Sequence, residues 1–176
     1  RLGAAGHTLT AVARGATLTA LRQHGMRLVQ GGETIVAPVQ AEEDPARLGP
    51  QDLVIIAVKG PALAAVAARI APLIAPDTMV LVAMNGVPWW FLPGKSLASV
   101  DPHGHIAATL PLAQTLGAVV HLTCHASTPG EVHHGFGERL IVGEPKGGPG
   151  PRVSKLAAAF TGAGFTTETS ADLRRD

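Results

Sequence analysis

The stretch DLVIIAVKGPALAAVAARIAPLIAPDTMVLVAM, residues 52–84, decides the fold of this chain. Leu53–Val58 and Thr78–Met84 are continuous apolar runs of strand length, as expected for strands buried on both faces of a parallel sheet. Between them, Pro61 occupies the first turn of a predicted helix over Ala62–Ile74, in which apolar residues recur at helical spacing. Strand, helix and strand with short connections indicate an α/β sheet with a right-handed crossover.

Further elements on both sides extend this α/β pattern along the chain. Upstream we expect strands at Leu9–Ala13, Met26–Gln30 and Glu33–Ala41, and a helix at Thr17–His24. Downstream we expect strands at Leu116–Thr123, Glu131–His134, Arg139–Val142 and Phe165–Thr169, and a helix at Val153–Thr161. Residues 88–105 are expected to form a long loop, and no convincing domain boundary precedes residue 170.

The composition fits one globular domain and narrows the classes of partner. With 46% apolar residues among 176, the chain can bury a sizeable core. Its 14 basic and 13 acidic side chains leave a net charge of +1, which favours neither nucleic acid nor a membrane surface as partner. No apolar run reaches the ~18 residues of a membrane span. The single cysteine, Cys124, cannot form an internal disulfide, which favours a reducing, cytoplasmic location.

Three polar residues follow predicted strands at the places where an α/β sheet binds its ligand. In open α/β sheets, ligands lie beyond the carboxyl ends of the strands. Arg14 follows the strand Leu9–Ala13, Lys59 follows the second apolar run, and Asn85 follows the third. Lys59 would point an ammonium group at the crevice, or it closes a loop as a surface charge. Asn85 would offer its amide to a ligand oxygen, or with Gly86 it forms a turn.

Arg14 indicates the cofactor. A dinucleotide-binding sheet that prefers NAD presents an acid at the end of its second strand, whereas an NADP site presents an arginine for the 2′-phosphate. No acidic residue occurs before Glu33, while Arg1, Arg14, Arg22 and Arg27 all do. This local charge asymmetry favours NADP, although a solvated loop residue is the alternative interpretation of Arg14.

Other chemistry-bearing side chains give weaker signals. The histidines of the segment that holds Cys124 lack a recognised metal-ligand spacing, so no metal is predicted; they are His121, His125, His133 and His134. No base is identifiable for Cys124, so a buried inert thiol is expected rather than a nucleophile. The segment Trp89-Trp90-Phe91 lies beside the predicted site and would either line a pocket or pack in the core.

Four segments in this order and spacing resemble the ketopantoate reductase (2-dehydropantoate 2-reductase) family: GHTLTAVARG at 6–15, DLVIIAVK at 52–59, MNGVPWW at 84–90 and PGEVHHGFGERLIVGEP at 129–145. The resemblance implies a Rossmann-like NADP-binding domain, followed in the family by a helical domain. It also implies NADPH-dependent reduction of a small 2-oxo acid, ketopantoate, to pantoate in pantothenate biosynthesis. By this resemblance Arg14 holds the 2′-phosphate, Lys59 lines the cleft, and Asn85 contacts the nicotinamide ribose or substrate.

The family pattern extends past both ends of the chain. The family's first strand and its G-x-G-x-x-G loop would precede Arg1, and the family's catalytic lysine would follow Asp176. We therefore expect an N-terminal domain truncated at both ends, with the dinucleotide-binding part over 1–169 and the start of the helical domain at 170–176. Without its central first strand the sheet would have a gap, and without the lysine this segment alone would show no turnover.

Two other functions remain open, together with the oligomeric state. A non-catalytic NADP-sensing domain would have the same sheet, and a different 2-hydroxy-acid dehydrogenase would have the same cofactor. The paired tryptophans and the absence of a glutamine after Lys59 leave room for another 2-oxo acid as substrate. A homodimer is compatible with the sequence.

Overall fold

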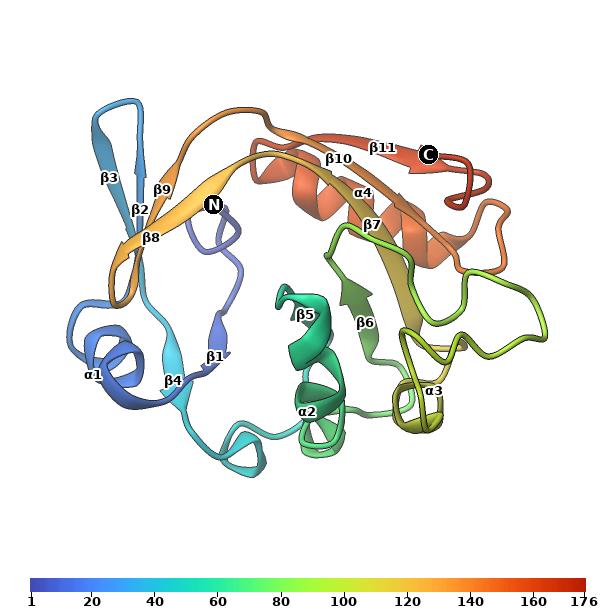
Figure 1. The fold of residues 1–176 in the computed structure, drawn as a ribbon. Coiled ribbons are helices and arrows are strands. Elements are labelled where there is room, and N and C mark those ends of the chain that lie inside the picture. The colour runs from blue at the N-terminus through green and yellow to red at the C-terminus, as the bar shows by residue number, and fades with distance from the viewer.

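The computed structural model describes residues 1–176, and its centre is a five-stranded sheet that confirms the predicted α/β class (Figure 1). The sheet has the order β11-β10-β7-β6-β5. Its strands are β5 (Leu53–Ile56), β6 (Met79–Val82), β7 (Thr115–His121), β10 (Arg139–Gly143) and β11 (Thr166–Ser170). β5, β6 and β7 are parallel, whereas β10 runs antiparallel to β7.

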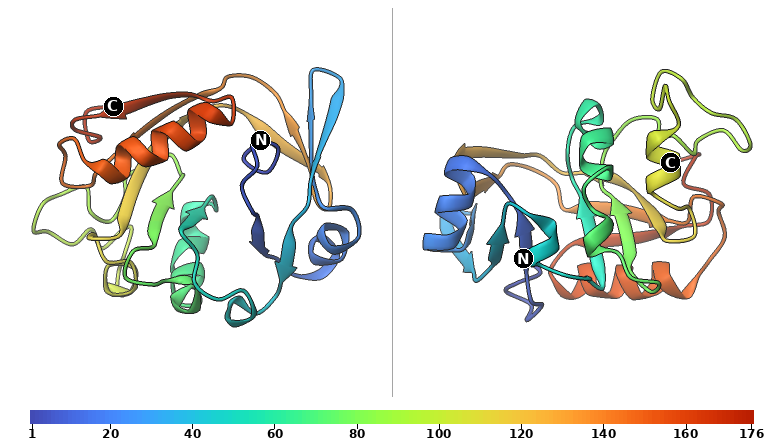
Figure 2. Two further views of the ribbon diagram at one scale, coloured as in Figure 1. Left: turned by 180° about the vertical axis from the view of Figure 1, so that it is seen from behind. Right: turned by 90° about the horizontal axis from the view of Figure 1, so that it is seen from below.

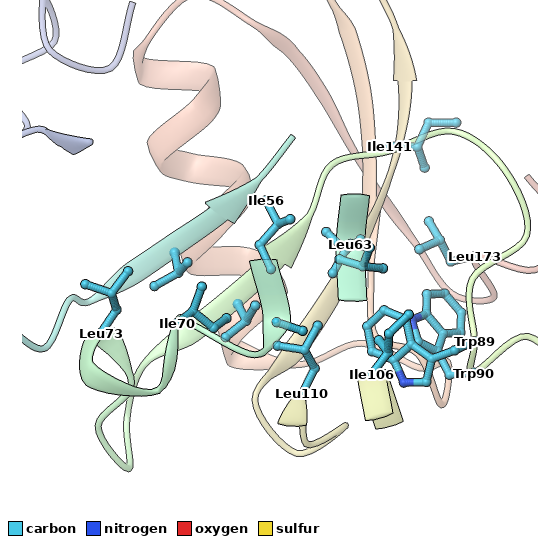
Figure 3. Close-up of a cluster of buried hydrophobic side chains, with 14 residues drawn as sticks. Ile56, Leu63, Ile70, Leu73, Trp89, Trp90, Ile106, Leu110, Ile141 and Leu173 are labelled. Atoms are coloured by element: carbon cyan, nitrogen blue, oxygen red, sulfur yellow. The ribbon is translucent and has the colours of Figure 1, made fainter. Parts of the chain in front are cut away.

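Helices cover both faces of this sheet (Figures 1 and 2). On one face, α4 (Pro151–Gly162) packs against the strands and buries Val153, Leu156 and Phe160. On the other face lie α2 (Leu63–Ala67), α3 (His105–Thr109) and the two tryptophans. Figure 3 shows this second core, where both indole rings lie beside Ile106 and Leu173. None of the helices combines the length and the apolar character needed to cross a membrane.

A second sheet is formed by two hairpins and has the order β3-β2-β9-β8. Its strands are β2 (Met26–Gln30), β3 (Glu33–Ala37), β8 (Cys124–Thr128) and β9 (Glu131–His134). The chain passes from β7 into β8 and from β9 into β10 through short connections, so these two segments join the two sheets (Figure 1). Sequence reasoning missed β8, because all five of its residues are exposed and it has no apolar alternation.

A third, two-stranded sheet pairs β1 (Thr10–Val12) with β4 (Gln40–Glu42) in parallel. β1 has β4 as its only strand neighbour, and β5 has only β6, so each keeps one unpaired edge. The right view of Figure 2 shows no strand between β1 and β5. Val12 and Ile55 are 45% and 40% exposed there. Each unpaired edge leaves backbone N–H and C=O groups without a strand partner.

Two predicted elements are corrected by the structure. The helix predicted over Ala62–Ile74 is α2 alone, flanked by short 3₁₀ turns, because Pro72 interrupts the helical hydrogen bonds. The strand predicted over Glu33–Ala41 divides at Pro38, which has no N–H to donate, into β3 and β4. The predicted long loop is present, and α3 begins at its last residue, His105, with its first N–H groups capped by the buried carboxylate of Asp101.

A polar cluster on the second sheet gives a prediction about acid stability. His133 Nε2 lies 2.9 Å from Glu131 Oε1, and this hydrogen bond is the main reason that the pKa of the Glu131 carboxyl is lowered. Ser127 donates to the same oxygen, and Arg27 lies 3.3 Å from Glu131 Oε2. A carboxyl with a lowered folded-state pKa stabilises the fold at neutral pH and loses that contribution as the pH falls through the folded-state value.

We therefore expect Glu131→Gln to lower the free energy of unfolding more at pH ~7 than at pH ~3, below the usual carboxyl pKa of about 4.3. The measurement is urea unfolding of the full-length protein at both pH values. An equal loss at both would show that the charge of Glu131 contributes nothing.

Candidate functional site

Lys59 and Asn85 lie at the same end of the main sheet, beyond the carboxyl ends of β5 and β6. Ile56 of β5 pairs with Val82 of β6, and each polar residue follows its strand's paired residue by three positions. The Ala83 N–H also donates to the carbonyl of Ile56, so β5 and β6 stay in register up to their last residues. Both side chains are exposed. The predicted convergence of these two residues at the carboxyl ends of parallel strands is present in the fold.

The carboxamide of Asn85 forms two hydrogen bonds with the backbone of the protein. Its Nδ2 donates to the carbonyl oxygen of Val120 at 3.0 Å, and its Oδ1 accepts from the Val120 N–H at 2.9 Å. The side chain thus extends the β6–β7 pairing to a point three residues beyond the last paired residues, Val82 and Gly117. Because the amide is held in this way, Asn85 helps to fix Gly86 and the loop after it. One N–H of the amide and one lone pair of its oxygen have no partner in the protein, so the predicted contact with a ligand stays a prediction.

Replacing Asn85 by aspartate tests this positioning. The carboxylate still accepts from the Val120 N–H but faces the Val120 carbonyl without a proton to donate. We expect a loss of about 1 kcal/mol in the free energy of unfolding, the usual size for one hydrogen bond. Denaturant unfolding of the full-length protein measures it, and an unchanged midpoint would contradict the role.

Arg14 lies two residues after β1, immediately before the N-terminus of α1 (Gly15–His24). Its guanidinium is exposed and makes no hydrogen bond or ion pair. A helix N-terminus and a free cation both favour an anion. The parallel β1–β4 pairing also places Glu42 opposite Val12, which sequence spacing did not reveal. Arg22 pairs with this carboxylate at 2.6 Å, so Glu42 does not cancel the charge of Arg14.

The fold adds a cavity of about 240 Å³ next to Asn85. Its walls include Trp90, Phe91, Leu173 and Arg174. Trp89 does not line it and packs in the core, so the tryptophan pair serves both of the roles considered from the sequence. Sequence reasoning missed the C-terminal segment as part of this site, because only tertiary packing brings residues 173–176 back to the end of β6.

Cys124, the remaining reactive side chain, lies on the second sheet and away from Lys59 and Asn85. Cys124 is exposed on β8, so the expectation of a buried thiol is wrong. Local desolvation nevertheless raises the pKa of the Cys124 thiol, which favours the protonated and unreactive form. His134 bonds to the carbonyl of Gly137, and His125 stacks on His133, so these side chains are engaged within the second sheet.

Comparisons with known proteins agree with this fold. Residues 1–147 match the family described as ketopantoate reductase PanE/ApbA. The chain is 38% identical over its full length to a 2-dehydropantoate 2-reductase of Mesorhizobium japonicum and covers 56% of that protein. The crystal structure of a ketopantoate reductase-type protein from Ralstonia solanacearum MolK2 is 54% identical and superposes with a TM-score of 0.96. That match covers 99% of this chain and 56% of the other.

The chain thus spans about half the length of the relatives that it matches. The fold is also that of D-mandelate dehydrogenase, solved with NADH and anilino(oxo)acetate, at 19% identity and a TM-score of 0.77. That match covers 96% of this chain and 51% of the other, and at this identity the likeness concerns the fold alone.

Proposed function

The chain belongs to the ketopantoate reductase PanE/ApbA family, and on this premise we propose that the whole protein reduces 2-dehydropantoate, or a related 2-oxo acid, to the 2-hydroxy acid with NADPH. The observation that carries the proposal is the shared carboxyl end of β5 and β6, where Lys59 and Asn85 stand in register and Asn85 lines a small cavity. Ligands of open α/β sheets bind at such an edge. A 2-dehydropantoate 2-reductase with 38% identity over the full chain supports the reaction class.

The residues present fit a nicotinamide dinucleotide with a 2′-phosphate. Arg14 offers an unpaired guanidinium at a helix N-terminus, and its planar fork suits a phosphate. Lys59 places a second cation at the end of β5. We assign Arg14 to the 2′-phosphate and Lys59 to the cleft. When bound, the dinucleotide supplies the hydride.

The chain's own part in the reaction is to position the substrate and to polarise its ketone group. Reduction of a ketone develops negative charge on its oxygen, which needs a nearby cation or proton donor. Lys59 supplies a positive field at the edge, and Asn85 holds the Gly86 loop in place through Val120. The proton donor that the family resemblance implies is a lysine following Asp176. We accordingly expect residues 1–176 alone to show no turnover.

A panel of 2-oxo acids tests the proposed function. The full-length protein is mixed with NADPH and each acid, and the loss of NADPH absorbance is followed. We expect turnover, with 2-dehydropantoate or another branched acid among the best substrates. A preference for an unbranched or aryl acid would indicate a different 2-hydroxy-acid dehydrogenase. Tight NADPH binding without turnover of any acid would contradict the proposal and favour a sensing domain.

A further inference from the structure

The carboxyl end of β4 brings an acidic side chain next to Arg14. Glu42, the last residue of β4, lies opposite Val12, the last residue of β1, and its carbonyl accepts from the Ala13 N–H at 3.0 Å. Arg14 is the next residue along the chain. A carboxylate at this place would repel a phosphate, and it is the group with which NAD sites bind the ribose 2′-hydroxyl. The fold thus places the acid typical of one cofactor beside the arginine typical of the other.

The carboxylate of Glu42 is held by Arg22 of α1. Arg22 Nη2 donates to Glu42 Oε2 at 2.6 Å, and Arg22 Nε donates to the Ala41 carbonyl at 3.0 Å. These two bonds to neighbouring residues fix the guanidinium against the end of β4. The Glu42 side chain is 21% exposed, and Arg22 is its only ion-pair partner. The helix therefore has an unpaired cation just before its first turn, Arg14, and a paired cation in its last turn.

We propose that Arg22 keeps the cofactor site selective for a 2′-phosphate by neutralising Glu42. While the ion pair is intact, the carboxylate is bonded to α1 and its charge is balanced, so Arg14 meets the phosphate without competition. Without Arg22, the carboxylate would repel the 2′-phosphate and would be free to accept a hydrogen bond from the ribose hydroxyl of NADH. Arg22 is thus a positioning residue that acts through Glu42. The inference rests on the proposed function, since it presupposes Arg14 at the 2′-phosphate, and adds the residue pair that sets the degree of selectivity.

The two acids that follow Glu42 differ from it in their surroundings. Asp44 caps the 3₁₀ turn that comes next in the chain, so its carboxylate is engaged there. Glu43 is exposed, and Arg69 donates to its backbone carbonyl rather than to its carboxylate. Solvent therefore screens the charge of Glu43, whereas the partly buried Glu42 depends on Arg22 for its balance. Glu43 serves as the matched control, because it carries the same charge one position further along the chain.

The test measures the dissociation constants of NADPH and NADH for the full-length protein by calorimetric titration, without a 2-oxo acid. Arg22→Met removes the cation and keeps a long side chain. It should lower the preference for NADPH about tenfold, because an unbalanced charge within the ~10 Å Debye length is only partly screened. Arg22→Lys keeps the charge and should retain most of the preference. Since each preference is a ratio of two constants measured on one variant, a loss of folded protein alone leaves it unchanged.

Two double variants decide the mechanism. Adding Glu42→Gln to Arg22→Met removes both charges of the pair and should return the preference to within about twofold of the wild-type value. Adding Glu43→Gln instead should recover no more than about twofold, because that exposed charge is screened. An unchanged preference in Arg22→Met would overturn the inference, and so would a failure of Glu42→Gln to restore it, which would place Arg22 itself on the phosphate. Equal recovery by both additions would show an effect of net charge alone and would also overturn it.

Measuring binding without turnover separates this inference from the proposed function. If the wild-type protein prefers NADPH but reduces no 2-oxo acid, the reductase proposal fails, and the expected pattern of variants still supports the role of Arg22. If the wild-type protein reduces an acid but binds NADPH and NADH equally, the reductase proposal stands and the inference about Arg22 is refuted.

Discussion

Replacing Arg14 by glutamate is expected to reduce the preference of the full-length protein for NADPH over NADH by about a hundredfold or more. Charge-assisted hydrogen bonds contribute about 1.5–3 kcal/mol each, and every 1.4 kcal/mol is a factor of ten in affinity. The exchange removes an attraction for the 2′-phosphate and adds a repulsion. Arg14 makes no internal ion pair, so the substitution should leave the free energy of unfolding nearly unchanged. The measurement is kcat/KM for both cofactors.

Lys155→Glu is the matched control for this charge reversal. Lys155 is exposed on α4, which covers the sheet, and the exchange alters net charge by the same amount. We expect it to leave the cofactor preference within about twofold, because exposed charges more than ~10 Å apart are screened at ordinary ionic strength. If Arg14→Glu and Lys155→Glu changed the preference equally, Arg14 would have no specific role.

Substituting Gly117 by valine is expected to destabilise the full-length protein by about 3 kcal/mol. Overpacking a filled core typically costs about 1–3 kcal/mol, and here the new atoms meet two large side chains seated against the backbone. The first added carbon alone collides with Leu173 and lies 2.9 Å from Trp90 Cζ2. The substitution also displaces the walls of the cavity, so activity should fall with stability. Denaturant unfolding and kcat/KM measure the two effects.

Gly162→Ala provides the comparison for a glycine in open space. Gly162 is the last residue of α4, and a Cβ there would have nothing within 4 Å. Alanine in a helix is more favourable than glycine by roughly 0.5–1 kcal/mol, so this variant should be slightly more stable than wild type. Equal midpoints for Gly117→Val and Gly162→Ala would show that the Trp90–Leu173 contact does not constrain β7.

Much of the fold is predictable because the central strands are buried on both faces. β6 is fully buried along its length, and such strands are apolar throughout, which makes them recognisable without periodicity. Lys59 and Asn85 follow from the same reasoning, because a polar residue after such a strand marks the carboxyl edge of the sheet. The exposed strand β8 has no comparable signal, since its pairing with β9 alone holds it.

The details of the candidate site depend on contacts between residues far apart in the sequence. The sequence offers Asn85 as a ligand contact or a turn residue, whereas its amide binds Val120, 35 positions away. Glu42 stands opposite Val12 only because β1 and β4 pair in parallel. Leu173 and Arg174 join the cavity only after β11 returns the chain to the sheet. No local pattern of residue types predicts these long-range contacts.

Parallel titration of the unmodified full-length protein with NADPH and NADH, at low and at high salt, tests the assignment of the cofactor most directly. The account predicts tighter binding of NADPH at low salt and a smaller difference at high salt, because exposed ion pairs are screened. Equal affinity for the two dinucleotides at both salt concentrations would contradict it.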